Sequence, residues 1–195
     1  MLTPTHWLVH AALARLDRRR AEAADAPPRI ASRAFLWGAV APDVPLTLLT
    51  AGAAAWYPAT QGLTVGESLE HAFSTMFFAD PVWKAANSLL HAPIVVAGGA
   101  LVSGLTRGWR DRWTWFLLGC TLHTAIDVPV HHDDGPLVLW PFDWDTRVVS
   151  PVSYWDPAHG GRWFQPLELT LAGGLAVWLW RGRRPSRRPD APTPG

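Results

Sequence analysis

Residues 113–130 read WTWFLLGCTLHTAIDVPV, a long apolar stretch that carries His123 and Asp127 in its second half. A bilayer-spanning helix needs roughly 17–25 such residues, so this stretch is long enough. His123 and Asp127 are four residues apart and therefore share one face of the predicted helix. Ionisable groups at membrane depth are costly and are usually kept for function. The stretch therefore predicts a transmembrane helix that carries a polar site.

The rest of the chain is also poor in charged residues and rich in Trp. Charged residues make up 17% of it, against about 25% in an ordinary soluble domain, and the chain has 13 Trp. Trp favours the boundary between hydrocarbon and water. We therefore predict an all-α fold, an integral membrane helical bundle of about four to five helices with a long ordered outer loop. Three further stretches are candidate spans: 34–57, 86–106 and 163–180.

Arginine placement predicts the orientation of these spans. Fourteen of the 16 Arg residues precede the first span, follow the last, or lie between the second and third. Short Arg-rich segments stay in the cytoplasm, which places residues 58–85 and 131–162 on the outer side. We expect a protein integral to the cell (inner) membrane with a cytoplasmic C-terminus. The alternative is a soluble α-helical domain whose rim is basic.

Composition also limits the function classes. The net charge of +1 predicts no nucleic-acid partner, and the single cysteine, Cys120, excludes an internal disulfide or a Cys-based zinc cage. We expect one membrane-embedded helical domain over residues 1–181, followed by a disordered basic cytoplasmic tail over 182–195 that is rich in Pro and Arg. The Gly98-Gly99 and Gly173-Gly174 pairs predict close helix packing in lipid.

Several polar residues gather toward the outer side of the predicted bundle. His6 begins the first helix, whose Arg-rich end is cytoplasmic, and Asp43 lies between Pro42 and Pro45, which break a span at depth. Pro129 ends the helix that carries His123 and Asp127, and it lets the following residues fold back. Carboxylates and neutral imidazoles together suit a divalent metal, zinc first, with manganese or iron as alternatives. The predicted metal ligands are His6, Asp43, His123 and Asp127, with His131 and Asp134 completing the site or holding a second ion.

A carboxylate that does not bind the metal, Asp133 or Asp134, could act as the catalytic general base. The sequence leaves the roles of His10, His71 and His91 open. His159 lies in a predicted loop and has no depth or spacing that would place it in the site.

The order of these motifs resembles a known family. Thr5-His6, then Pro42-Asp43 after a Gly-rich apolar run, then His123-x3-Asp127 followed by Trp140-Pro-Phe are similar to the integral-membrane metal-dependent hydrolase family, which is distantly like zinc-dependent phospholipase C. The resemblance touches most of residues 1–160, and Asp127–Asp134 together with Ser150–Asp156 resembles one uncharacterised branch. Where the family often has His-Ser, this chain has Asn87-Ser88, and His91 is the candidate replacement.

Two functions follow as expectations. The first is a membrane-bound metal-dependent hydrolase that acts on an ester or phosphoester at the membrane surface, with the lipid bilayer as partner and a lipid-like molecule as substrate. The alternative is a non-catalytic membrane protein whose His/Asp cluster binds metal structurally or conducts an ion.

Overall fold

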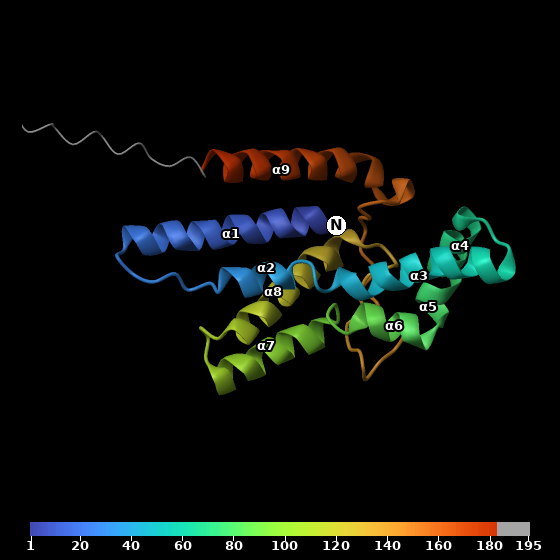
Figure 1. Ribbon diagram of the computed structural model, residues 1–195, viewed down its shortest axis with the longest axis horizontal. Helices are drawn as coiled ribbons and strands as arrows, with labels where there is room; N and C mark the ends of the chain where they lie inside the picture. The colour runs from blue at the N-terminus through green and yellow to red at the C-terminus, as the bar shows by residue number, and fades with distance from the viewer. Residues whose placement is uncertain (183–195) are drawn as a thin grey trace, which may run out of the picture.

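The computed structural model describes residues 1–182 and confirms the all-α class (Figure 1). Within that range the only β-type pairing is one isolated bridge between Leu137 and Arg147. The helices are shorter and more numerous than the four or five expected, because breaks interrupt the predicted spans. The predicted tail lies outside the described residues apart from Gly182.

Five helices form the larger body, with α8 at its centre. Helix α8 packs against α2 and α7, and α1 packs against α2 and α9. Figure 1 shows α1 and α9 side by side along one edge of the molecule. The bounds of these helices are α1 Thr3–Ala23, α2 Ser32–Gly38, α7 Pro93–Arg107, α8 Arg112–Asp127 and α9 Gly161–Arg181.

The helices between α2 and α7 form a smaller lobe with its own apolar core. Ala53, Ala72, Phe77 and Trp83 are buried there together. Asp80 begins the last helix of the lobe by accepting hydrogen bonds from two backbone N–H groups, which satisfies part of the helix end. The elements are α3 Asp43–Gln61, α4 Val65–His71, the π-helical turn η1 Ala72–Met76, α5 Phe77–Ala79 and α6 Pro81–Ser88.

A long connection follows α8 and returns to its end. The short 3-10 turn η2 (Val128–Val130) ends the helix, and a second, η3 (Pro157–His159), precedes α9. Between them the backbone is tied back to the start of the connection, because the N–H of Tyr154 donates to the carbonyl of Val130 at 2.8 Å. Leu137 is fully buried in this loop. These contacts hold the residues after α8 close to the helix end.

Two of the predicted spans are broken, one of them beside Asp43 as the sequence predicts. Helix α2 meets α3 at a 44° bend, and α6 meets α7 at a 41° bend. Proline lacks an N–H and disfavours helical geometry in the residue before it, and Pro42 and Pro93 lie at these two breaks. Within residues 1–182 no single helix has the length and hydropathy of a membrane span, whereas each bent pair has both when its two helices are taken together.

The closest helix approach is made by glycines other than the predicted pairs. Gly38 on α2 faces Gly119 on α8, and a β-carbon on either would overlap the backbone of the opposite helix. Gly98, by contrast, has no atom of the described chain within 4 Å of where its β-carbon would stand, and the same holds for Gly173 and Gly174. The predicted close packing is therefore not found within residues 1–182 at Gly98, Gly173 or Gly174, whereas a β-carbon at Gly99 would stand 3.5 Å from Leu117 on α8.

Gly38→Ala is expected to lower the free energy of unfolding by about 1–3 kcal/mol, because overpacking forces the backbones of α2 and α8 apart. Gly98→Ala is the matched control, since the same methyl meets open space and removes flexibility from the unfolded chain. Denaturant unfolding followed by circular dichroism measures both. Equal stability of the two variants would show that α2 and α8 do not cross this closely.

Candidate metal centre

Four ionisable side chains from three parts of the chain converge at the centre of the molecule. They are Asp43, His91, His123 and Asp127, and one ligand atom from each lies within 4.8 Å of the others. Both helix breaks contribute to this group, because Asp43 begins α3 and His91 lies between α6 and α7. The other two residues come from the last turns of α8, as their four-residue spacing predicts.

The distances within this group match a tetrahedral cage. The Nε2 atoms of His91 and His123 are 3.0 Å apart, and His123 Nε2 is 3.1 Å from Asp127 Oδ2. Asp43 Oδ1 lies 3.4 Å from both Nε2 atoms, and His91 Nε2 lies 3.7 Å from Asp127 Oδ2. A tetrahedral ion with bonds of 2.0–2.1 Å would separate its ligand atoms by about 3.3–3.4 Å. These five distances, 3.0–3.7 Å, are therefore close to those between the ligands of one zinc-sized ion.

Backbone carbonyls fix which ring nitrogen carries the proton. His91 Nδ1 lies 3.0 Å from the Asn87 carbonyl, and His123 Nδ1 lies 2.9 Å from the Ala39 carbonyl. A carbonyl oxygen only accepts, so each Nδ1 carries the hydrogen, and a neutral ring presents a lone pair at Nε2. Two lone pairs 3.0 Å apart repel each other unless a proton or a metal cation lies between them. Metal-binding histidines commonly have this arrangement, in which one nitrogen donates to a carbonyl and the other binds the ion.

His6 lies one layer outside the group of four. Its ring stacks on His123 with 3.8 Å between centroids, and its Nε2 is 3.0 Å from Asp127 Oδ1, the oxygen that faces away from the other ligands. The amino group of Met1 donates to the same oxygen at 2.7 Å. The predicted ligand His6 is thus placed to orient Asp127. Thr3 does the same for Asp43, because its hydroxyl donates to Asp43 Oδ2 at 2.5 Å.

His131 and Asp134 form an adjoining pair. His131 Nε2 is 3.6 Å from Asp127 Oδ1, and its Nδ1 is 3.1 Å from Asp134 Oδ1. The indole of Trp155 donates to the other Asp134 oxygen at 2.7 Å. The turn at Pro129 therefore does fold the chain back, as predicted. It brings the His131 ring next to Asp127, and Asp134 lies on the opposite side of that ring.

Charge and burial act in opposite directions on this pair. Burial would raise the pKa of the Asp134 carboxyl, but its contact with His131 outweighs burial and holds that pKa below its ordinary value. Burial would likewise lower the pKa of the His131 ring, and its contacts with Asp127 and Asp134 outweigh burial and raise that pKa. The pair therefore favours an ionised carboxylate beside a basic ring.

The remaining polar residues lie elsewhere. Asp133 is exposed and makes no contact with the group within residues 1–182. His10 is buried and its two nitrogens contact the His6 and Gly119 carbonyls. His71 packs its ring edge-on against a tyrosine in the smaller lobe. His159 stacks on His132 at 3.5 Å, away from the four ligands.

The sequence did not assign His91 to the site. Its signal was weak, because a histidine near the start of a predicted span reads equally well as an interfacial residue. Its position in the group depends on the break before Pro93, where the backbone turns the ring toward α8. The departure from His-Ser at Asn87-Ser88 did point to His91 as a replacement.

Comparisons with known protein families, with curated proteins and with solved structures find no match for this chain. The class that the described fold and site define is an all-helical protein with a His/Asp group, buried except at Asp43, that could hold a metal ion.

Proposed function

We propose that this protein is a membrane-bound, zinc-dependent hydrolase that acts on an ester or phosphoester at the membrane surface. The observation that supports it most is the meeting of two imidazole lone pairs and two carboxylate oxygens at tetrahedral spacing. Neutral imidazole with carboxylate suits zinc, and manganese or iron could take the same ligands. A divalent ion held there would polarise the scissile group and acidify water.

His131 is the residue we propose as the proton acceptor. Its Nε2 lies 3.6 Å from Asp127 Oδ1 and 3.4 Å from the Met1 nitrogen, while Asp134 Oδ1 lies 3.1 Å from its Nδ1. A carboxylate behind a histidine is a common way to orient a general base. This assignment revises the expectation that Asp133 or Asp134 is the base, since Asp133 is exposed and Asp134 lies behind the ring. Asp134 then acts as a positioning residue.

Access to the cluster is greatest at Asp43. Its side chain is 25% exposed, whereas those of His123 and Asp127 are 0% and 6% exposed. A substrate would therefore approach from the Asp43 side. The other three ligands would hold their positions under the cover of α1 and the loop after α8.

A lipid setting is supported by the outer faces of the helices. Large apolar side chains are exposed along α7 and α9, among them Leu101, Leu105, Leu167 and Leu169. Large exposed apolar side chains on two separate helices support contact with a partner or a membrane. The two bent helix pairs are long and apolar enough to enter a bilayer, and a break at depth is tolerated where it is buried in protein. We propose the bilayer as partner and a lipid-like molecule as substrate.

The proposed orientation gives a topological prediction. A reporter fused after Arg188 is expected to be active only in its cytoplasmic form, because most Arg residues lie in three alternate segments. Paired fusions to a cytoplasm-active and an export-active enzyme measure this. Activity of only the export-active fusion would reverse the orientation.

The function itself is tested on the purified full-length chain in detergent. We expect about one equivalent of zinc per chain by elemental analysis, because the cage supplies one set of four ligands. We also expect hydrolysis of chromogenic esters or phosphoesters that chelation abolishes and zinc restores. His123→Ala is expected to lose both, and His159→Ala to lose neither. Metal-free protein, or hydrolysis that survives chelation, would defeat the proposal.

A structural metal is the second candidate, and one observation favours it. Asp43, His91, His123 and Asp127 already make four protein ligands, and structural zinc sites usually have all four positions filled by protein. In that case removing a ligand would unfold the protein, and no hydrolysis would be found. A His131 variant distinguishes the two candidates, because His131 lies outside the group of four. Its loss would reduce hydrolysis in a catalytic site and would leave a structural metal site unchanged.

A further inference from the structure

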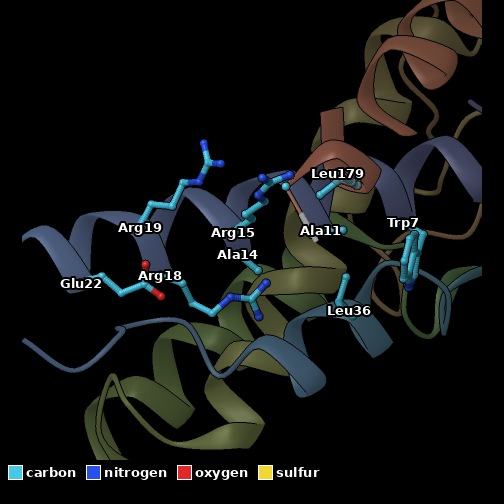
Figure 2. A pocket seen from close by; sticks show the side chains of 10 residues that line it. Trp7, Ala11, Ala14, Arg15, Arg18, Arg19, Glu22, Leu36 and Leu179 are labelled. Atoms are coloured by element: carbon cyan, nitrogen blue, oxygen red, sulfur yellow. The ribbon is translucent and has the colours of Figure 1, made fainter. Parts of the chain in front are cut away.

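A second polar site lies far from the metal centre, in a cavity of about 320 Å³ between α1, α2 and the end of α9. Figure 2 shows the side chains around it, with Arg15 and Arg19 above α1 and Arg18 below it in this view. Arg15, Arg18 and Arg19 line it together with Trp7, Leu36 and Leu179. The volume is at the lower end of the roughly 300–1,000 Å³ typical of small-molecule sites.

Arg15 is the most informative residue of this cavity. Its side chain is buried, with the residue only 8% exposed, and its guanidinium donates to the backbone carbonyl of Trp178 and lies over that indole ring at 4.2 Å. No carboxylate in residues 1–182 lies within salt-bridge distance of it. A buried charge is costly unless an opposite charge or several acceptors compensate it. The structure thus leaves a buried cation without its counter-ion.

The neighbouring arginines add further positive charge that has no carboxylate partner within residues 1–182. Arg18 and Arg19 also have no carboxylate within salt-bridge distance in the described chain. Among the described residues Glu22 is the one acidic residue that lines the cavity, and it forms no ion pair with any of the three. Among residues 1–182, three arginines and one acidic residue therefore line the cavity.

We propose that this cavity binds a phosphate-bearing anion. Arginine presents a planar fork of donors that matches phosphate oxygens, and such charge-assisted hydrogen bonds are the strong ones. The anion would supply the counter-charge that Arg15 lacks. Trp7, Leu36 and Leu179 would contact an apolar portion if the phosphate belongs to a lipid headgroup.

This site is independent of the metal centre. Arg15 is nine residues after His6 on the same helix, which separates them by roughly 13 Å along its axis. The Arg-rich end of α1 is also the end predicted to face the cytoplasm, where anionic lipid headgroups bind basic pockets between helices. The anion site does not depend on the hydrolase proposal, and either could fail alone.

Isothermal titration of the purified full-length chain tests the site with two ligands, inorganic phosphate and a short-chain phosphatidic acid. Arg18→Gln is expected to weaken binding roughly tenfold or more, because it removes one charge-assisted contact. Arg15→Gln should weaken it further. Arg110→Gln is the control, since Arg110 is exposed in the turn between α7 and α8 and loses the same charge.

A third variant displaces Arg15 without removing any charge. A β-carbon at Gly182 would overlap the Arg15 guanidinium, so Gly182→Ala should push that group aside and weaken binding. Zinc content, measured in every variant, should stay at the wild-type level. Binding of free phosphate supports a small-anion site, and binding of the lipid alone supports a headgroup site. The proposal is overturned if neither ligand binds, or if Arg18→Gln and Gly182→Ala bind as Arg110→Gln does.

Discussion

Asp127→Asn should yield a protein that no longer retains metal and is less stable by about 3–5 kcal/mol, the usual cost of removing one member of a buried charged set. Both Asp127 oxygens are in use. Oδ2 faces His123 and His91, and Oδ1 receives the Met1 amino group and the His6 ring. The amide keeps the shape of the side chain but removes the charge that these groups require.

Elemental analysis and denaturant unfolding of the same preparation measure the two effects. Asp133→Asn makes the same chemical change on an exposed side chain, so it should leave metal content and stability unchanged. An Asp127→Asn protein with its full complement of zinc would show that this carboxylate is not a ligand. A loss of stability without a loss of metal would make Asp127 a purely structural ion-pair partner.

His131→Ala should reduce hydrolysis roughly 10²–10⁴-fold while zinc is retained, because general acid–base groups contribute about that much to rate. His131 lies outside the four ligands but contacts Asp127, so its removal should spare the cage. Asp134→Asn should produce a smaller loss, since it removes only the group that orients the ring. Rates under substrate saturation, with zinc measured beside them, give both effects.

The matched control is His159→Ala, which removes a loop imidazole that stacks on His132 away from the ligands. It is expected to keep full activity. Retained activity in His131→Ala would assign the base elsewhere. Loss of zinc in that variant would instead make His131 a ligand, as the sequence allowed.

The sequence predicts those parts of the site whose geometry depends only on helix periodicity and on proline. His123 and Asp127 share a helix face whatever surrounds the helix, and prolines on both sides of Asp43 predict a break that exposes its carboxylate to other segments. These three residues do meet in the structure. The all-α class followed from long apolar stretches, which also needed no tertiary information.

The features that the sequence did not predict depend on tertiary packing. The sequence predicts a break beside Asp43 but treats 86–106 as one continuous span, so it does not predict the break that turns His91 toward α8. His6 lies near the site as expected, but its ring contacts Asp127 rather than the position between the ligand atoms of the group of four. A displacement of a few ångströms separates these two arrangements, and the sequence does not specify it. Loop residues such as Asp133 and Asp134 could not be separated, because only the folded loop shows which of them faces His131.

The contact between Gly38 and Gly119 has a consequence for chemistry as well as for packing. Ala39 follows Gly38, and its carbonyl holds the proton on Nδ1 of His123. That oxygen reaches the ring only because the two backbones touch nearby. Losing such a partner typically weakens metal affinity about 10–100-fold. A single methyl group at Gly38 would therefore alter the basicity of His123, so the separation of two helices would set how tightly a metal ion binds in the proposed site.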